Sequence, residues 1–384
     1  MFYIEKGNVM SDFIPVNEPL LNGNEKKYLN ECIDTGWISS EGPFVKRFED
    51  SFAKKVNRKY GIAVANGTAA LDIAVEALGI GEGDEVILPT FTIISCIHQI
   101  IRSGATPVLV DSDPNTWNMD ISQIEEKITI KTKAIMVVHI YGLPVDIDPI
   151  LELAIKYNLK IIEDAAEMIG QSYKGNPCGS FGDLSTFSFY PNKHITTGEG
   201  GMVLTDDEEL AEKCRSMRNL CFQRKQRFVH DKLGWNYRMT NLQAALGLAQ
   251  LEQLESFVDK KRTIGKTYTK LLKGIKEIQL PLEKTDYAEN IYWVYGIVLK
   301  DDIPFDAKEA MQKLGKQGIG TRPFFWPMHL QPVLLNKGLF KGEQYPVAER
   351  ISRRGFYIPS GLALNNSEIE KITKVLQKIL YKIN

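Results

Sequence analysis

Residues 60–111 carry the pattern that decides the fold: YGIAVANGTAALDIAVEALGIGEGDEVILPTFTIISCIHQIIRSGATPVLVD. Short β-branched and aliphatic runs at 61–65, 85–89 and 107–111 alternate with a helical pattern at 69–78. Parallel strands need crossover connections that are usually helical, so this alternation favours a parallel sheet. We therefore expect an open α/β sheet at the centre of this chain.

The alternation continues to residue 206. Further strand-like runs lie at 134–139, 160–164, 184–190 and 201–205, and a helical segment lies at 149–157. Together with the first three runs, they predict a mostly parallel sheet of about seven strands that is buried on both faces.

The pattern changes after residue 241. Apolar residues take helical spacing over 241–272, which predicts one long helix leading out of the sheet domain. An aromatic strand at 291–299, a loop rich in proline and aromatic residues at 321–332 and a terminal helix from 367 follow. Because 384 residues exceed what one core usually organises, we predict a large domain at 13–260 and a smaller α/β domain at 261–384, with a cleft between them.

Composition excludes several classes of protein. The chain is 43% hydrophobic and 25% charged, with 47 basic and 48 acidic residues, so nucleic acid is not an expected partner. The one basic cluster, Arg224, Lys225 and Arg227, is either a solvated loop or a phosphate-contacting surface. Five cysteines without metal-ligand spacing predict a reduced, cytoplasmic protein without a metal site. We expect neither a signal peptide nor a membrane span.

Ligands of open parallel sheets bind outside the carboxyl ends of the strands, so polar groups at those ends are candidate site residues. Residues 65–70, ANGTAA, turn from a strand directly into a helix. The backbone amides there and the Thr68 hydroxyl are suited to hold a phosphate, because a helix N-terminus presents unpaired N–H donors. The alternative is an ordinary turn with a helix N-cap.

A second strand end carries two acids, Glu163 and Asp164. Strand residues alternate between faces, so one of the two carboxylates points toward the crevice. There it can pair with a protonated ring nitrogen and keep a pyridine cofactor cationic. The alternative is an N-cap of the following helix.

Lys193 follows a strand that stops at Pro191 and precedes the glycine- and threonine-rich residues 196–201. A lysine amine forms an imine with an aldehyde if its pKa is lowered by desolvation or nearby cations. A loop lysine alone is usually solvated, so the hypothesis depends on finding a phosphate turn, an acid and a lysine at ends of one sheet. Phe91, at another strand end, either stacks on a planar cofactor or is a core residue.

Six long segments resemble the DegT/StrS family of sugar-nucleotide aminotransferases over essentially the whole chain. The segments are GWISSEGPFVKRFE (36–49), VANGTAALDIAVEALGI (64–80), GDEVILPTFT (83–92), IIEDAAE (161–167), SFYPNKHITTGEGGMV (188–203) and GWNYRMTNLQAALGLAQLEQL (234–254).

This resemblance implies the aspartate aminotransferase-type fold, the cofactor pyridoxal 5′-phosphate (PLP), and a homodimer with the active site at the subunit interface. Lys193 corresponds to the lysine that holds PLP as a Schiff base, and Asp164 to the partner of the pyridine nitrogen. The other implied roles are phosphate contacts from Gly67, Thr68, Ser188 and Asn236 of the partner subunit, ring stacking by Phe91, and a cofactor contact of Glu167 where relatives often have His or Gln.

Residues 223–239 and 321–329 are most similar to the family's GDP-perosamine synthases, which move an amino group from L-glutamate to C4 of GDP-4-keto-6-deoxymannose. UDP-sugar 4-aminotransferases share most of these motifs, so a UDP sugar is the alternative substrate. Loops predicted to border the cleft hold four candidate substrate contacts, each of which is alternatively a packing residue: Trp37, Ser39, Trp326 and His329.

Two further alternatives remain. In the family's PLP-dependent sugar dehydratases a histidine replaces the lysine; here Lys193 is present with His194 beside it, and the flanking residues align so as to favour transamination. A non-catalytic PLP- or sugar-binding regulator would be expected to carry an appended DNA-binding module or a strongly basic face, neither of which the sequence contains.

Overall fold

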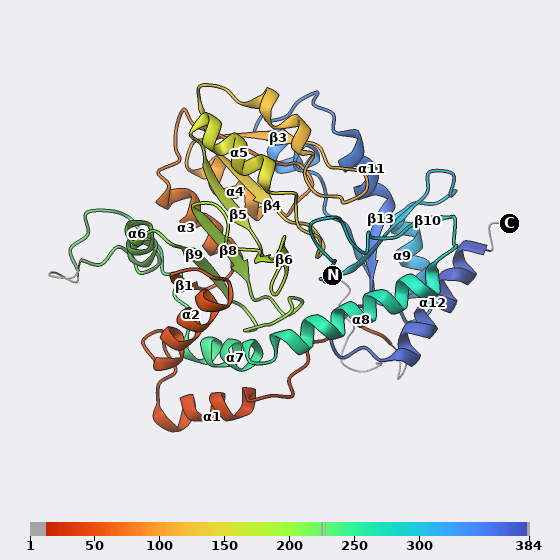
Figure 1. Cartoon of the computed structure of the whole chain (residues 1–384), viewed down its shortest axis with the longest axis horizontal. Helices are drawn as coiled ribbons and strands as arrows, with labels where there is room; N and C mark the ends of the chain where they lie inside the picture. Colours follow the sequence, from red (N-terminus) through yellow and green to blue (C-terminus); the bar gives the residue numbers. More distant parts are fainter. Residues whose placement is uncertain (1–12, 224–225, 227, 382–384) are drawn as a thin grey trace.

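The structure is a computed structural model that describes residues 13–223, 226 and 228–381 (Figure 1). Arg224, Lys225 and Arg227 of the basic cluster lie outside the described residues. No helix among the described residues is both long and apolar enough to cross a bilayer.

The predicted central sheet is confirmed. Within the described chain it has seven strands in the order β1-β9-β8-β5-β4-β2-β3. Neighbours from β8 to β3 pair in parallel, and β9 is antiparallel to both β1 and β8. The strands are β1 (Tyr60–Val64), β2 (Glu85–Pro89), β3 (Thr106–Val110), β4 (Thr132–Val138), β5 (Lys160–Asp164), β8 (Leu184–Ser188) and β9 (Gly201–Thr205).

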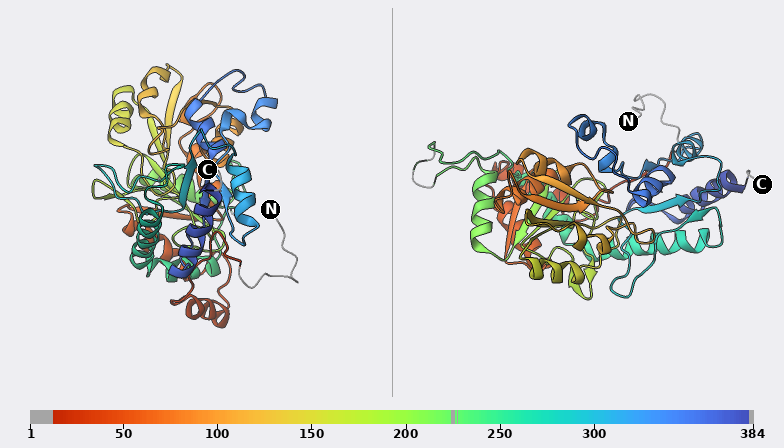
Figure 2. Two further views of the ribbon diagram at one scale, coloured as in Figure 1. Left: turned by 90° about the vertical axis from the view of Figure 1, so that its right-hand side faces the viewer. Right: turned by 90° about the horizontal axis from the view of Figure 1, so that it is seen from above.

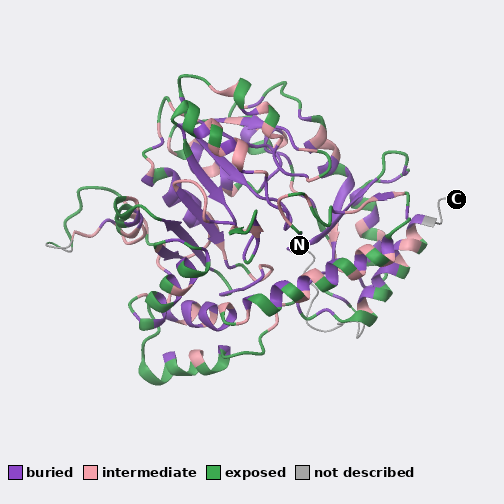
Figure 3. Cartoon of the chain, in the orientation of Figure 1, coloured by how far each residue is buried: buried purple, intermediate pink, exposed green. Residues whose placement is uncertain are grey.

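Both faces of this sheet are covered, so its strands are buried while the outer faces of the helices are exposed (Figure 3). Alternate residues of one strand enter different cores: Ile62 and Val64 pack on one face and Ala63 on the other. One face packs on α3 (Gly67–Ala77), α4 (Ser95–Arg102) and α6 (Glu208–Arg218), and the other on α2 (Pro43–Lys55), α5 (Asp148–Tyr157) and α7 (Asn241–Leu251). A further helix, α1 (Glu25–Thr35), lies against α7.

The prediction of a single long helix at 241–272 is wrong. The segment forms α7 and then α8 (Leu254–Leu272), because Gln253 leaves helical geometry with φ −108° and ψ 4°. The Glu252 carboxylate at this break accepts hydrogen bonds from Asn24 and Tyr28, which ties the break to the start of α1.

A smaller unit lies to one side of the central sheet and is joined to it by α8 (Figures 1 and 2). In the part of the chain that the structure describes, it has four strands, which pair antiparallel in the order β10-β11-β13-β12. The first half of α8 packs on the core of the large sheet and the second half on the core of the small one, which also contains Ile14. The elements are β10 (Ile278–Gln279), β11 (Tyr295–Leu299), α9 (Ala307–Gly315), β12 (Arg322–Pro323), α10 (Pro332–Asn336), α11 (Pro346–Arg354), β13 (Gly355–Ile358) and α12 (Asn366–Tyr381).

The aromatic strand expected at 291–299 begins later, at Tyr295, because Tyr292 has a left-handed backbone with φ 48°. The residues before β11 therefore turn back toward the large domain, where the Trp293 indole nitrogen donates to the carbonyl of Asn192 at 2.8 Å. This turn brings a side chain of the smaller unit to the end of β8.

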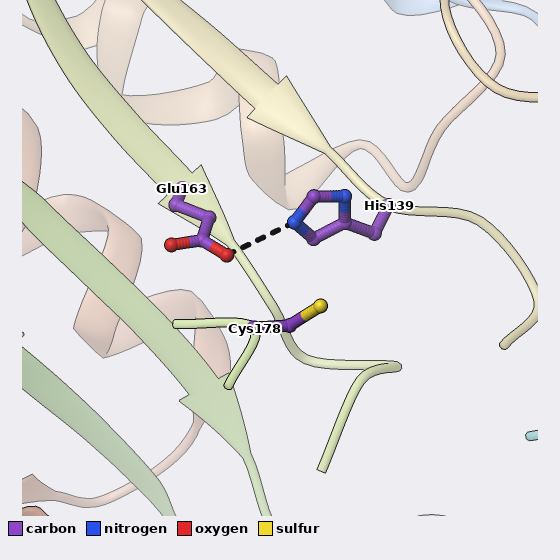
Figure 4. A group of neighbouring side chains, drawn as sticks. All are labelled: His139, Glu163 and Cys178. Carbon is purple, nitrogen blue, oxygen red and sulfur yellow. Dashed lines mark hydrogen bonds and ion pairs between the residues drawn. The ribbon is translucent and has the colours of Figure 1, made fainter. Parts of the chain in front are cut away.

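The two acids at the end of β5 face opposite ways. Glu163 is fully buried beside His139, which follows β4 (Figure 4). Its carboxylate accepts hydrogen bonds from His139 Nε2 at 3.0 Å, from the Gly179 N–H at 2.5 Å and from the Phe181 N–H at 2.9 Å. Glu163 thus fastens the 178–182 loop to the sheet, while Asp164 is left to face the other side.

Cys178 completes a group of three potential metal ligands with His139 and Glu163. The Val145 N–H donates to His139 Nδ1 at 3.0 Å, so Nε2 carries the ring proton and points it at Glu163. Burial and the nearby Glu163 charge raise the pKa of the Cys178 thiol well above its usual value, which disfavours the thiolate that binds metals. This geometry is that of a hydrogen-bonded structural group.

We predict that Glu163→Gln reduces the free energy of unfolding by about 2–4 kcal/mol, because the amide NH₂ leaves at least one buried donor without an acceptor. Urea denaturation measures the loss, with the exposed Glu152→Gln as the matched control. EDTA should leave the wild-type unfolding midpoint unchanged. A midpoint that falls on chelation would contradict the hydrogen-bonded assignment.

Candidate active site

A cavity of about 650 Å³ lies at the carboxyl ends of β5 and β8. The N-terminal turns of α3 and α4 form one part of its wall, and residues of the smaller unit form another. Six of the predicted site residues line it together: Gly67, Thr68, Asp164, Glu167, Ser188 and Lys193.

One end of the cavity is lined by hydrogen-bond donors. The Asn66 side chain caps α3 by accepting from the Ala69 N–H at 2.8 Å, so the N-cap alternative for this turn also holds. The Thr68 hydroxyl lies 2.8 Å from that of Ser95, at the start of α4. A Cβ on Gly67 would lie 2.8 Å from the Ser188 Cβ, so only glycine allows this approach of the serine. The start of α3 and the hydroxyls are suited to a phosphate group. Sequence reasoning missed Ser95.

Asp164 supplies a buried carboxylate to the same cavity. Its Oδ1 accepts from the Ala166 N–H at 3.0 Å, and its Oδ2 accepts from the Cys96 thiol at 3.3 Å. Burial raises the pKa of Asp164, and these two donors oppose the rise. A carboxylate held in this way is suited to pair with a cationic ring N–H.

Lys193 and Glu167 face each other across 3.9 Å, with side chains only 10% and 9% exposed. Burial lowers the pKa of Lys193, while the charges of Glu167 and Asp164 oppose that change. Burial also raises the pKa of Glu167 to about 8, against the opposing effects of Lys193 and of the Tyr141 N–H, which donates to Glu167 at 2.7 Å. Both groups are therefore displaced toward their neutral forms, and the amine gains nucleophilic character.

Trp293 covers the amine from the smaller unit. The Lys193 Nζ lies 3.8 Å from the centre of the indole ring, and Tyr357 and Phe325 line the cavity nearby. Sequence reasoning placed residue 293 in an aromatic strand without a site role. The only signal was the aromatic run itself, because this contact joins residues 100 positions apart.

His194 points away from the cavity although it follows Lys193. Its Nε2 lies 3.3 Å from the Ile291 carbonyl oxygen, and the ring is 1% exposed. Burial lowers the pKa of His194 to about 3, so the ring stays neutral. Of the two neighbouring residues, Lys193 therefore lines the cavity and His194 does not.

The expected ring stacking by Phe91 requires a correction. Phe91 is fully buried against Tyr141, Phe324 and Phe325 and does not line the cavity. Burying a large apolar ring completely in this aromatic core is more favourable in free energy than leaving it partly exposed in the cavity wall. Ile93, which is 47% exposed, occupies the wall instead.

His329 does not border the cavity as expected. It is buried, with Nδ1 2.8 Å from the Thr90 hydroxyl and Nε2 3.1 Å from Glu349, so both ring nitrogens have partners. Trp326 is exposed and donates its indole N–H to the Leu330 carbonyl. The remaining predicted residues, Trp37, Ser39 and Asn236, are exposed and lie outside the cavity of their own chain.

The donor set of the cavity fits PLP. A helix N-terminus with hydroxyls suits the phosphate, the Asp164 carboxylate suits the pyridine nitrogen, and Lys193 offers an amine to the aldehyde. The Nζ of Lys193 makes no hydrogen bond within the described chain, and the buried Thr186 hydroxyl in the cavity wall has no partner there. The Lys193 amine in the cavity wall is therefore available to a ligand.

Comparison with known proteins agrees with this geometry. Residues 19–377 match the DegT/DnrJ/EryC1/StrS aminotransferase family. The chain is 46% identical to GDP-perosamine synthase of Escherichia coli O157:H7 over 93% of this chain and 96% of that protein. It is 42% identical to GDP-perosamine synthase of Caulobacter vibrioides over 97% of this chain and 100% of that protein.

The fold is likewise that of a solved relative. Spr1654 from Streptococcus pneumoniae, in its PLP form, superposes with a TM-score of 0.89 and 27% identity, covering 97% of this chain and 100% of that one. The residues that match the family include the phosphate turn, the strand-end acid and the cavity lysine. The chain therefore belongs to the DegT/DnrJ/EryC1/StrS aminotransferase family and is a PLP-dependent enzyme.

Proposed function

We propose that this enzyme transfers the amino group of L-glutamate to C4 of GDP-4-keto-6-deoxy-D-mannose, giving GDP-perosamine and 2-oxoglutarate. The observation that carries the amino-transfer chemistry is the buried, pKa-lowered amine of Lys193 in one cavity with the Asp164 carboxylate. The GDP-perosamine synthases at 46% and 42% identity support the sugar nucleotide. The five free, buried cysteines support our assignment of the enzyme to the cytoplasm.

When bound, PLP would supply an aldehyde carbon that can carry an amino group and a ring that can take up the electron pair of the reacting carbon. Asp164 would pair with the pyridine nitrogen of that ring and favour its protonated, cationic form. Lys193 would hold the cofactor through its Nζ, and the free amine of the same residue would move the proton at the reacting carbon. A neutral amine is required for that step, which agrees with the lowered pKa of Lys193.

Glu167 acts beside the amine in this proposal. Its Oε2 accepts from Tyr141, while its Oε1 lies nearest to Lys193. Burial raises the pKa of Glu167 to about 8, which favours its protonated form near neutral pH, and the protonated acid would donate a hydrogen bond to the cofactor or to the free amine of Lys193. Gly67, Thr68 and Ser188 hold the phosphate, and Ile93 packs on the ring in place of Phe91.

We further propose a homodimer in which each cavity receives Asn236 of the partner subunit. Asn236 is exposed and lies outside the cavity of its own chain. Two apolar residues of the cavity wall, Ile93 and Tyr190, are 47% and 49% exposed, so part of this wall is open to a covering surface.

A UDP-linked sugar is the alternative substrate, since a UDP-N-acetyl-3-dehydro-α-D-glucosamine 3-aminotransferase of Acidithiobacillus ferrooxidans is 38% identical over 97% of both chains. That identity is lower than the 46% shared with a GDP-perosamine synthase. The sugar dehydratase alternative would need His194 in the cavity, and this ring is buried elsewhere.

Lys193→Ala should lower steady turnover by about 10³-fold or more, because both the covalent anchor and the proton carrier are removed. It should also abolish the visible absorbance of the lysine-bound cofactor. Glutamate-dependent turnover and absorbance spectra measure these losses, with exposed Lys316→Ala as the control. A Lys193→Ala protein that still turned over glutamate at the control rate would overturn the assignment.

Mixing Lys193→Ala and Asn236→Ala enzymes tests the shared site. If Asn236 acts across the interface, subunit exchange should restore about a quarter of wild-type activity, because half of the dimers become mixed and each keeps one intact site. The two variants alone serve as controls. Absence of recovery after proven exchange would mean that Asn236 acts within its own subunit or not at all.

Substrate choice is tested by supplying glutamate with GDP- or UDP-linked 4-keto-6-deoxy sugars. We expect 2-oxoglutarate formation to require the keto-sugar, with kcat/KM at least about 100-fold higher for the GDP sugar, as two or more lost base contacts would produce. Mass spectrometry of the amino-sugar product identifies the position. Preference for a UDP sugar would reverse the choice of nucleotide and leave the amino-transfer assignment intact.

A further inference from the structure

Cys96 lies directly behind Asp164, on the side away from the cavity. It sits in the first turn of α4, is 1% exposed and does not line the cavity. Its Sγ is 3.3 Å from Asp164 Oδ2 and 3.2 Å from the Thr92 hydroxyl oxygen. The thiol therefore connects the loop after β2 to the acid at the end of β5.

The direction of these hydrogen bonds follows from chemistry. An ionised carboxylate only accepts, so the single thiol hydrogen must go to Asp164, and the Thr92 hydroxyl must donate to the sulfur. Burial, with the Asp164 charge nearby, raises the pKa of Cys96 well above its usual value, so the thiol keeps this hydrogen. The Thr92 hydroxyl thus donates to the Cys96 sulfur, and the Cys96 thiol donates to the Asp164 carboxylate. Hydrogen bonds connected in this way polarise and strengthen one another.

Asp164 depends on such donors because no cation pairs with it within ion-pair distance in the described part of the chain. Lys193 favours its charged form from a greater distance, and Glu167 is a second acid nearby. The His139 ring, whose Nδ1 accepts from the Val145 N–H, is neutral. Of the two hydrogen bonds that Asp164 accepts, one comes from the Ala166 backbone in its own turn. Cys96 supplies the other, which among the described residues is the only hydrogen bond to this carboxylate from a different element.

We propose that Cys96 is a positioning residue of the active site: its thiol holds Asp164 in the orientation that faces the cavity and keeps the carboxylate ionised for the ring N–H of the cofactor. The inference rests on the proposed function, in which Asp164 pairs with the pyridine nitrogen. Substrate never touches Cys96; its effect passes wholly through Asp164.

The test measures binding of 4′-deoxypyridoxine 5′-phosphate, which has the ring nitrogen and phosphate of PLP but no aldehyde to react with Lys193. Its dissociation constant is followed by fluorescence from about pH 5 to about pH 8 in wild type, Cys96→Ala, Cys96→Ser and the control Cys214→Ala. Cys214 is an equally buried cysteine on α6, packed in a different part of the core.

Removing the thiol removes a donor to the charged form, so the pKa of Asp164 rises in Cys96→Ala. Affinity that needs the ionised carboxylate then begins to fall at a higher pH on acidification. We expect Cys96→Ala to bind the analogue roughly threefold to tenfold more weakly, with its acid limb moved to higher pH. Cys96→Ser, which restores an O–H donor, should return both toward wild type, and Cys214→Ala should match wild type.

The inference is overturned if the three cysteine variants share the wild-type profile, or if Cys96→Ser fails as Cys96→Ala does although both retain the wild-type thermal midpoint. Loss of stability equal to that of Cys214→Ala, with an unmoved acid limb, would assign Cys96 to packing alone. If wild type binds neither PLP nor the analogue, the proposed function itself fails, which is a different result.

Discussion

Parallel pairing of β4, β5 and β8 is the constraint on which the site depends. The register sets Val138 beside Asp164 and Asp164 beside Thr186, so β4 and β5 end at one level and β8 continues past it to Ser188. Chain segments that leave these ends must start from the same edge of the sheet, where no strand follows to fill the space. The acid and the lysine loop meet there because β5 and β8 are neighbours. The helix that carries the phosphate turn joins them because β1, which it follows, runs in the same direction as β8 with only β9 between them.

Because side chains alternate between the two faces of β5, the adjacent carboxylates of Glu163 and Asp164 have different surroundings and different roles. Glu163 faces the core, where three donors satisfy it and it holds the 178–182 loop in place. Asp164 faces the cavity with two donors and keeps capacity for another partner. The same strand thus supplies a structural acid and a candidate cofactor acid one residue apart, because successive side chains point to opposite faces.

Desolvation determines the chemical state of the site. Burial disfavours the charged forms of Lys193 and Glu167, and their mutual attraction across 3.9 Å offsets only part of that effect. Trp293 covers one side of the amine, and it reaches Lys193 because the backbone turns at Tyr292 before β11. The smaller unit therefore contributes to the reactivity of a lysine that belongs to the larger one.

The sequence by itself determined the features that depend on short-range pattern. The seven strands, the glycine turn at Gly67 and the candidate acid and lysine at strand ends followed from apolar runs and from the residues that end them. It also indicated Phe91, because an aromatic beyond a strand resembles a stacking ring. In the tertiary structure, Ile93 rather than Phe91 lines the cavity. Side chains no longer alternate between faces once the strand has ended, so the packing of the neighbouring core determines which of them is buried.

Contacts between distant segments could not be predicted from the sequence either, because they too depend on how the whole chain packs. His329 was expected at the cleft, but Thr90 and Glu349 hold both of its nitrogens inside the protein. Trp293 over Lys193 and Cys96 behind Asp164 join residues 100 and 68 positions apart. Local sequence carries no record of which distant surface a side chain meets, so the partners that position and desolvate the acid and the lysine were decided only by the packing of the whole chain.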